Sequence, residues 1–469
     1  MTRYTLTILE EHRATLRNTL LHDEKEYGAL LLCGRSRHVD PWTKELEERV
    51  LVHEVIEVPP EAFLQRTPTS MRWSTTPLYK LAKRAMKQDL ALVVAHSHPD
   101  GPLAFSGKDD VADEESFGIV YTRMDTVRPH FSLVMDGEGE MIARAFGPEL
   151  KPSPVTLIRV IGKRYVMRYP GRGAGVTAQE FDRSVRAFGQ FSVQDLTAMR
   201  IGIVGCGGTG SAVASLLGRL GVGRIVLIDA DRVELTNLNR LHFSKRSDAI
   251  LGRLKVDVVA EAIADIGLAT SVVKLPYFAD SPLCRDALRS CDVIFGCTDD
   301  HLGRDMLNRL AHFYLIPVID LGLLIKPSEK MDEYEVFDGR VTVVQPGYPC
   351  QVCRQLINPD RMLQEDLRRG DPVLLEERRR AGYVPDAPDP SPVVVTFTTE
   401  VATMAVNELL HRVTGFRGPD GEAGERVRKF TDVKDCDTLA GAHPVEGCPL
   451  CQRRRFDGRG DMKPYLNRT

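Results

Sequence analysis

Over the first 150 positions, short apolar blocks alternate with polar ones, which is typical of strands interspersed with helices. Apolar blocks of strand length occur at 29–33, 50–58 and 90–95. Residues 75–87 have helical spacing, with a proline in the first turn. Two further blocks, 130–135 and 140–145, flank a glycine-containing turn and predict a β-hairpin.

From residue 200 the pattern becomes a regular alternation of apolar strands and amphipathic helices. This rhythm predicts a doubly wound, Rossmann-like parallel sheet. The predicted strands are 201–204, 224–229, 271–275, 292–297 and 317–321, and the predicted helices are 210–220, 251–266, 282–290, 301–314 and 398–414. Residues 358–392 are rich in charge and proline, and we expect a long mobile loop there.

The chain is therefore predicted to be an α/β protein with two domains, within the range expected for 469 residues. Glycine and proline residues over 147–154 indicate the boundary. We predict a first domain over 1–150, a linker over 151–177, a second domain over 178–455 and a tail over 456–469.

Charge and cysteine content narrow the functional classes. A formal net charge of −3 gives no basic surface for nucleic acid or an anionic membrane. No apolar run is long enough to span a bilayer, and the N-terminus does not resemble a signal peptide. Four of the ten cysteines form two Cys-x-x-Cys pairs, which indicates metal binding in a reducing cytosol. We expect a cytoplasmic protein.

The first candidate centre follows the apolar block at 90–95. His96 and His98 are two residues apart, so on a strand both imidazoles lie on one face. Asp109 follows on a helix that begins near Ser106, a natural N-cap. Two histidines and one carboxylate form an open zinc site with a position left for water. Zinc lowers the pKa of that water, and a carboxylate must then move its proton.

The spacing His-x-His-Pro, six residues, Ser-x-x-Asp resembles the JAMM/MPN+ (JAB) metallopeptidases over roughly residues 5–147. The resemblance implies cleavage of peptide or isopeptide bonds after the C-terminal glycine of ubiquitin-like proteins. It implies Glu26 as general acid/base, with Glu24 as a rival, and Ser106 as support for the oxyanion. The competing interpretations are a structural His pair, a solvated carboxylate at Glu26, and a non-catalytic scaffold that only binds ubiquitin-like partners.

The second candidate centre is a glycine loop between a predicted strand and a predicted helix. Its glycines let the backbone approach phosphates at a helix N-terminus. Asp229, at the end of the next strand, is placed to hold ribose hydroxyls. To this point an NAD-dependent dehydrogenase remains an alternative. The loop glycines are Gly205, Gly207, Gly208 and Gly210.

The residues that follow the loop resemble the ThiF/MoeB family, the fold of ubiquitin-activating enzymes, over about residues 178–452. The resemblance implies ATP and Mg²⁺ as cofactors and adenylation of a terminal carboxylate. By position it implies nucleotide contacts from Asp231 and Asn239, phosphate contacts from Arg240 and Lys255, and a magnesium ligand at Asp299. A looser match assigns Arg183 to the ATP of a partner subunit, which implies a homodimer formed through this domain.

The two Cys-x-x-Cys pairs are four thiolates suited to a closed structural zinc site, with a redox role as the alternative. They are Cys350, Cys353, Cys448 and Cys451. Family members that form a thioester carry a nucleophilic cysteine after the first pair, but residues 354–428 contain none. Cys436 is the only cysteine between the pairs, so the reaction either ends at an acyl-adenylate or uses Cys436.

We therefore expect one chain that trims or releases a ubiquitin-like or sulfur-carrier protein and then adenylates its terminal glycine carboxylate. Fusion of the two activities would raise the effective concentration of the intermediate. Two downstream pathways remain open: bacterial ubiquitin-like conjugation, with a conjugating enzyme as partner, and thiocarboxylate formation for cofactor or metabolite synthesis, with a sulfurtransferase.

Overall fold

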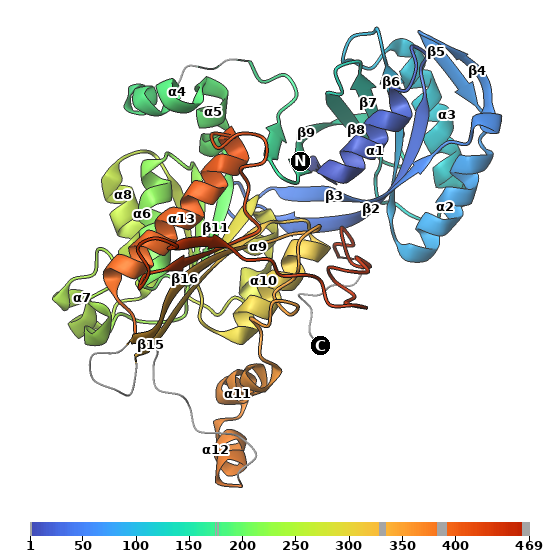
Figure 1. The fold of residues 1–469 in the computed structure, drawn as a ribbon. Helices are drawn as coiled ribbons and strands as arrows, with labels where there is room; N and C mark the ends of the chain where they lie inside the picture. Colours follow the sequence, from blue (N-terminus) through green and yellow to red (C-terminus); the bar gives the residue numbers. More distant parts are fainter. Residues whose placement is uncertain (1, 174, 176–177, 328–333, 382–391, 462–469) are drawn as a thin grey trace.

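The computed structural model describes residues 2–173, 175, 178–327, 334–381 and 392–461. Its strands form two eight-stranded sheets and one two-stranded hairpin. Figure 1 shows the first sheet in blue at upper right and the second sheet at lower left. The predicted α/β class is confirmed. Within the described residues, no helix is both long and apolar enough to cross a membrane.

The first sheet has the order β1-β3-β2-β6-β7-β8-β9-β10, and β1 also pairs with β9. Helix α1 covers one face through Leu16 and Leu20, and α2 and α3 cover the other through Leu78 and Phe117. The strands are β1 (Arg3–Leu9), β2 (Gly28–Val39), β3 (Leu46–Glu57), β6 (Ala91–His98), β7 (His130–Asp136), β8 (Met141–Phe146), β9 (Pro152–Ile161) and β10 (Tyr165–Arg168). The helices are α1 (Glu10–Leu20), α2 (Thr76–Gln88) and α3 (Gly107–Arg123), and a 3-10 turn, Pro60–Ala62, precedes the hairpin β4 (Phe63–Thr67) and β5 (Ser70–Trp73).

The second sheet has the order β13-β12-β11-β14-β15-β16-β17-β18. The first five strands are parallel, and the last three extend the sheet in antiparallel fashion. The strands are β11 (Arg200–Val204), β12 (Arg224–Ile228), β13 (Ser271–Leu275), β14 (Val293–Gly296), β15 (Val318–Pro327), β16 (Tyr334–Val344), β17 (Glu425–Lys429) and β18 (Asp437–Leu439). The helices are α4 (Asp182–Phe188), α5 (Gln190–Ala198), α6 (Gly208–Arg219), α7 (Arg246–Leu251), α8 (Lys255–Ile266), α9 (Arg285–Ser290), α10 (His301–Phe313), α11 (Pro359–Gly370), α12 (Pro372–Arg380) and α13 (Val395–Thr414), with 3-10 turns at Gln179–Phe181, Leu235–Asn237 and Pro282–Cys284.

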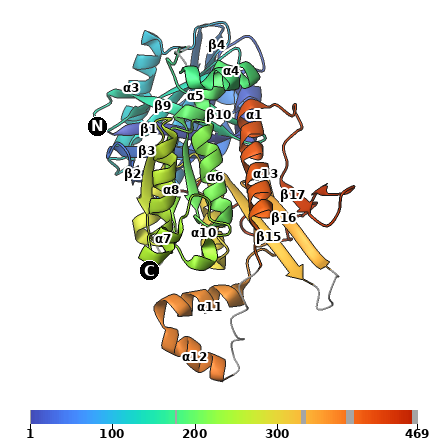
Figure 2. The same cartoon turned by 90° about the vertical axis from the view of Figure 1, so that its left-hand side faces the viewer.

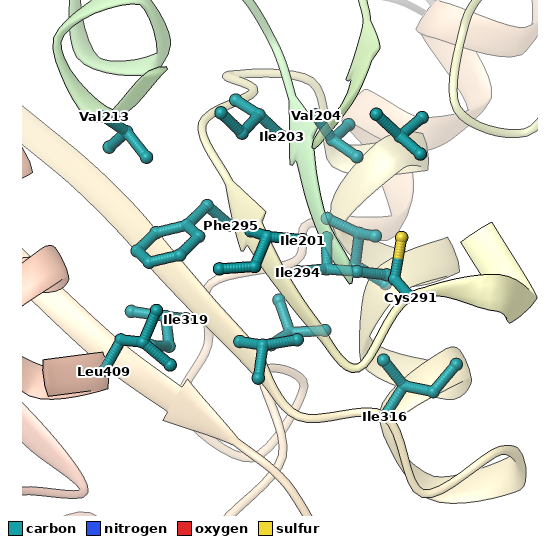
Figure 3. Packing of buried hydrophobic residues seen from close by; sticks show 14 of the residues in the cluster. Ile201, Ile203, Val204, Val213, Cys291, Ile294, Phe295, Ile316, Ile319 and Leu409 are labelled. Carbon is teal, nitrogen blue, oxygen red and sulfur yellow. The ribbon is translucent and has the colours of Figure 1, made fainter. Parts of the chain in front are cut away.

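The core of the second domain has helices on both faces of the parallel strands. Figure 3 shows Ile201 of β11 and Ile294 of β14 beside each other, with Val213 of α6 and Leu409 of α13 around them. These side chains are almost completely removed from water. Such burial contributes about 25 cal/mol for each Å² of apolar surface, so this core stabilises the strands whose ends carry the predicted nucleotide site.

Three segments differ from the sequence predictions, and the third, residues 456–461, is described below with the contacts between the domains. Residues 152–168 were predicted to be part of a linker, but they form β9 and β10 of the first sheet. The prolines at the start of β9 masked an apolar strand. The predicted loop over 358–392 contains α11 and α12, both with proline at a first helical turn and a side-chain N-cap. Figures 1 and 2 show these two helices standing away from the second sheet below α10. Residues 382–391 lie outside the described residues.

The two domains meet at the amino ends of the parallel strands of the second sheet. Arg200, the first residue of β11, donates to Asp40 Oδ2 at 2.9 Å and to Glu47 Oε2 at 2.7 Å, both in the first domain. Arg159 of β9 donates to Asp292 at 2.7 Å. All five side chains are at most 2% exposed. Burial opposes ionisation of Glu47, but the neighbouring arginines hold its pKa well below the ordinary range. The interface is thus a buried, fully charged network.

The segment that precedes the end of the described chain ties the domains together. Gly34 N of β2 donates to Gly458 O at 3.1 Å, and Gly458 N donates to His312 O of α10 at 2.9 Å. Asp461 accepts from Arg37 N at 2.7 Å and from Tyr314 Oη at 2.9 Å. Residues 456–461 were predicted to belong to a C-terminal tail over 456–469, but they form a strap between β2 and α10. Residues 462–469 lie outside the described residues.

Candidate active sites

The first site stands where β6 ends and α3 begins. His96 Nε2 lies 3.2 Å from His98 Nε2, because residues two apart on β6 share a face. The two oxygens of Asp109 lie 3.0 Å from His96 Nε2 and 3.5 Å from His98 Nε2. Neighbouring nitrogen and oxygen donors around a tetrahedral zinc ion lie about 3.3 Å apart. The three side chains therefore converge as predicted, and their donor set fits a zinc ion.

The carboxylate of Asp109 is held in place by the N-terminal cap of its own helix, α3. Ser106 and Asp109 form a capping box, in which Asp109 Oδ2 accepts from Ser106 N at 2.6 Å and Ser106 Oγ at 2.7 Å. Burial alone would raise the pKa of Asp109, but hydrogen bonds from His96 and His98 hold it well below the ordinary range. Ser106 thus orients Asp109, and its one hydroxyl proton is donated to that carboxylate, so the oxyanion role predicted for Ser106 would require this bond to break.

Glu26, at the entrance to β2, is only 9% exposed, whereas its rival Glu24 is exposed. Its backbone is fixed by Arg66, whose Nε donates to Glu26 O at 3.0 Å, and by Thr67 O, which accepts from Glu26 N at 3.0 Å. Burial raises the pKa of Glu26, while His96 and His98 oppose the shift. A buried carboxyl beside two imidazoles suits a group that moves a proton.

The hairpin β4–β5 borders this site, and sequence reasoning did not identify it. Lys108 of α3 donates to Thr69 O in the hairpin turn at 3.4 Å. A Cβ added to Gly28 would lie 3.2 Å from the Met71 methyl carbon, so the hairpin packs tightly on the start of β2. The sequence signal for this hairpin is a Thr-Pro-Thr-Ser turn between two short runs of alternating polar and apolar residues. Such a signal is weak evidence for a hairpin.

The second site is built on the glycine loop between β11 and α6. Gly205 has φ +93°, and a Cβ there would lie 2.6 Å from Cys297 O. A Cβ on Gly210 would overlap the carbonyl oxygen of Gly205. Both positions therefore require glycine, since the loop packs on the end of β14. The loop leads directly into the N-terminus of α6, which begins at Gly208. This arrangement suits phosphate binding by backbone amides.

Acidic and basic side chains converge beside the loop. Asp229 accepts from Cys206 N at 2.6 Å and from Asp231 N at 2.8 Å, and Lys255 Nζ lies 2.7 Å from Asp231 Oδ2. Burial would lower the pKa of Lys255, but the charges of Asp229, Asp231 and Asp299 raise it. Lys255 is therefore a cation within reach of all three predicted acidic residues. Asp299 itself is exposed and open to a metal ion.

Arg240 lies over the glycine loop. Its Nη1 donates to Thr236 O at 2.6 Å and to Asn239 Oδ1 at 3.2 Å. A Cβ added to Gly208 would lie 3.4 Å from Arg240 Cγ and 3.3 Å from Thr398 Cγ2 of α13. Sequence analysis did not identify Thr398 as a neighbour of the glycine loop. Helical periodicity predicts the helix α13 itself, but it does not predict which part of the molecule α13 packs against.

The four cysteines of the two Cys-x-x-Cys pairs come together between the ends of β16 and β18. Cys350 Sγ lies 3.8 Å from Cys448 Sγ, and Cys353 Sγ lies 3.5 Å from Cys451 Sγ. With zinc–sulfur bonds of about 2.3 Å, tetrahedral geometry places neighbouring sulfurs about 3.8 Å apart. The cluster fits a structural zinc ion.

Two predicted residues lie away from the glycine loop. Arg183 is exposed on α4. Cys436 lies in the β17–β18 turn, four strands from β11, or about 19 Å at the usual strand spacing. Cys206 and Cys297 do border the loop, but burial raises the pKa of both thiols. They are therefore protonated and poor nucleophiles.

The two sites face in opposite directions. The nucleotide site lies at the carboxyl edge of the second sheet, whereas the first domain contacts the amino edge through Arg200. The metal site lies beside Gly28, at the end of β2 remote from that interface. The twelve residues of β2, from Gly28 to Val39, alone span about 40 Å. Figure 1 shows β4–β5 and α7, which border the two sites, at opposite ends of the molecule.

Comparison with known proteins agrees with both halves. A model of prokaryotic homologs of the JAB domain matches residues 9–144, and a model of the ThiF family matches residues 181–441. Solved structures of E. coli MccB are similar to part of this chain; the complex with ATP, for example, has 17% sequence identity and a TM-score of 0.43 over 59% of this chain and 75% of that chain.

Curated relatives match parts of the second domain. Molybdopterin-synthase adenylyltransferase of Escherichia coli (strain K12) is 30% identical over 173 residues, which cover 36% of this chain and 64% of that protein. The SAMP-activating enzyme E1 of Haloferax volcanii is 28% identical over 158 residues, covering 34% of this chain and 54% of that protein. The matches thus span less than two thirds of these relatives. The ThiF model covers more than half of the length of this chain. The chain therefore belongs to the ThiF family, with a JAB-type domain at its N-terminus.

Proposed function

We propose that the ThiF-type domain adenylates the C-terminal glycine carboxylate of a ubiquitin-like or sulfur-carrier protein, and that the JAB-type domain is a zinc peptidase that trims or releases the same carrier. The observation that carries the proposal is the convergence of Lys255, Asp229, Asp231 and Asp299 beside a phosphate-binding glycine loop. Two similar proteins support this proposal by their names: a molybdopterin-synthase adenylyltransferase and a SAMP-activating enzyme E1.

In the adenylation step, a carboxylate oxygen of the carrier attacks the α-phosphorus of ATP, and pyrophosphate leaves. The loop amides and the N-terminus of α6 hold the phosphates, while Arg240 and Lys255 neutralise the charge that develops on the leaving group. Asp229 holds the ribose. Asp299 would hold Mg²⁺, which would neutralise negative charge on the phosphates. The carboxylate thereby gains a good leaving group.

In the peptidase step, His96, His98 and Asp109 would hold zinc, which makes bound water acidic enough to serve as a nucleophile near neutral pH. Glu26 accepts a proton on its carboxylate and later donates it to the leaving amine. The burial that raises the pKa of Glu26 favours this exchange. Ser106 would donate a hydrogen bond to the developing oxyanion once its hydroxyl turns away from Asp109.

The fate of the acyl-adenylate follows from the position of the thiols. Cys206 and Cys297 are buried and protonated, and Cys436 lies four strands away from the loop strand. We therefore favour transfer of the adenylate to a separate acceptor. A sulfurtransferase and a conjugating enzyme both remain candidates, and a thioester on Cys436 is the alternative. Because the two sites face apart, we propose that trimmed carrier is released before it is adenylated.

ATP–pyrophosphate exchange with Gly-terminated carrier proteins tests the central reaction. We expect exchange that depends on the carrier and on Mg²⁺, that survives His96→Ala and that is lost in Asp299→Ala. Intact mass analysis of wild type after exposure to carrier and ATP tests the thiol alternative, since a carrier adduct that an added thiol cleaves by acyl transfer would place a thioester on the chain. Absence of exchange with every carrier tested would overturn the proposed adenylation.

A further inference from the structure

A second group of charges at the carboxyl edge of the second sheet has no role in the nucleotide hypothesis. Asp320 of β15 is completely buried. Arg340 of β16 donates from Nη2 to Asp320 Oδ2 at 2.9 Å, and Arg304 Nε of α10 lies 3.5 Å from Asp320 Oδ1. Two guanidinium groups therefore share one carboxylate. We call Arg304, Asp320 and Arg340 the arginine pair site, and its formal charge is +1.

The arginine pair site lies next to the glycine loop. Asp320 pairs with Gly296 in the register of β14 and β15, and Gly296 precedes Cys297, on which Gly205 packs. Asp320 is thus two strand spacings from the loop strand β11, or about 10 Å. A Cβ on Gly296 would lie 3.1 Å from Asp320 Oδ1, so glycine leaves room for the carboxylate that holds the two arginines.

The two guanidinium groups retain capacity for another anion. Their side chains are 14% exposed for Arg304 and 17% exposed for Arg340. Among the described residues, neither Nε has a hydrogen-bond partner, although both are buried. Asp320 neutralises only one positive charge. An arginine fork matches carboxylates and phosphates in geometry as well as in charge, so this site suits an oxyanion of either kind.

The cations around the glycine loop divide into two sides. Arg240 and Lys255 lie with Asp231 and Asp229 on the β12 side, where they serve the polyphosphate. Arg304 and Arg340 lie on the side of β14 to β16. The reaction brings together two anions, a triphosphate and a carboxylate. Each side of the loop therefore has the positive charge that one of these anions requires.

We propose that Arg304 and Arg340 bind the C-terminal carboxylate of the polypeptide substrate and deliver it to the glycine loop, with Asp320 as the residue that positions both guanidinium groups. The inference rests on the proposed adenylation of a terminal carboxylate. It identifies the chemical feature that the enzyme recognises: a free α-carboxylate on a chain end narrow enough to reach past β15. A C-terminal amide or an extended chain would lack this interaction.

The test compares two synthetic peptides that end in Gly-Gly, one with a free carboxylate and one with a C-terminal amide. Their binding is measured by calorimetry in the presence of Mg²⁺ and a non-hydrolysable ATP analogue. We expect wild type to bind the acid about 10- to 100-fold more tightly than the amide, as charged hydrogen bonds are lost with the amide. Arg304→Gln and Arg340→Gln should each reduce that preference and leave affinity for the analogue unchanged.

The matched control is Arg219→Gln, an exposed arginine at the far end of α6, which should retain the full preference. Circular dichroism and the melting temperature of each variant report whether it is folded. Equal affinity of wild type for the two peptides, no binding of the acid, or an unchanged preference in folded Arg304→Gln and Arg340→Gln would overturn the inference. Failure of the ATP analogue to bind wild type would instead overturn the proposed adenylation.

Discussion

The two candidate active sites are built in different ways. The metal site draws its three ligands from β6 and the first turn of α3, within 14 consecutive residues, His96 to Asp109. The nucleotide site is assembled from the ends of β11, β12 and β14 and from the start of α8, over nearly 100 residues. The first is a local motif, whereas the second depends on correct packing of a whole sheet.

This difference predicts different sensitivities. Loss of one metal ligand should abolish metal binding without affecting the nucleotide site, because the two sites lie at the edges of two different sheets. Disruption of the interface between the domains should weaken the nucleotide site, since the amino ends of β11 and β14 carry Arg200 and Asp292 of the buried charged network. Substitutions in each region can therefore separate the two activities or show that they are coupled.

The largest expected effect is on the metal site. Asp109→Asn removes a charged ligand and should lower peptidase activity by about 10³-fold or more, because the zinc-bound nucleophile contributes most of the rate. Zinc content should fall by one ion per chain, as measured by elemental analysis. The matched control is Asp125→Asn, an exposed residue beyond α3. Pyrophosphate exchange should persist, and a parallel loss of exchange would contradict the independence of the sites.

The next effect is on the domain interface. Glu47→Gln removes one of the three buried carboxylates that neutralise Arg200 and its neighbours, leaving Asp40 and Asp292, and should lower the free energy of unfolding by roughly 3–5 kcal/mol. The exposed Glu45→Gln is the control, and chemical denaturation measures both. Because the folded-state pKa of Glu47 is depressed, its stabilisation is complete above the ordinary value of 4.5 and is lost as the pH falls below it. The Gln variant should lack this acid-dependent loss.

A smaller effect concerns the nucleotide site alone. Lys255→Met should reduce ATP–pyrophosphate exchange by about 10²-fold, since it removes one charge that stabilises the leaving pyrophosphate. Lys274→Met, an exposed lysine of β13, is the control. Peptidase activity should be unchanged. If Lys255→Met retained full exchange, the assignment of Lys255 to the phosphates would be wrong.

The smallest effect tests the strap between the domains. Asp461→Asn weakens contacts to Arg289 and Tyr314 and should lower the free energy of unfolding by about 1–3 kcal/mol. Hydrogen exchange should increase in the second half of β2 and at the end of α10. The exposed Asp435→Asn provides the comparison. Unchanged hydrogen exchange in β2 would show that residues 456–461 do not hold the first domain against the second.

Sequence patterns predicted the local site better than the distributed one. The period of two on a strand and the Ser106 cap were enough to bring His96, His98 and Asp109 together. The glycine loop and Asp229 also followed from strand–helix alternation. The arginine pair site could not be predicted, because its members come from α10, β15 and β16, and the antiparallel extension of the sheet had no distinctive periodicity.

Proline and charge were misleading in two places for the same physical reason. Proline fixes φ near −65°, which suits a strand start and a first helical turn as well as a loop. Pro152 therefore starts β9, and Pro359 and Pro372 start α11 and α12. The strap over 456–461 was missed because its contacts join residues far apart in the sequence, through the backbone of Gly458 and Gly460 and the side chain of Asp461, and no periodic pattern marks such contacts.

The placement of the two sites is tested most directly by a trapping experiment. A radiolabelled carrier with a short extension beyond Gly-Gly is mixed with wild type, ATP and an excess of unlabelled trimmed carrier, and the label in the acyl-adenylate is followed by quenched time points. Sites that face apart require release of the trimmed carrier, so the label should be diluted in proportion to the unlabelled excess. Undiluted transfer of label into the adenylate would contradict the separation of the two sites.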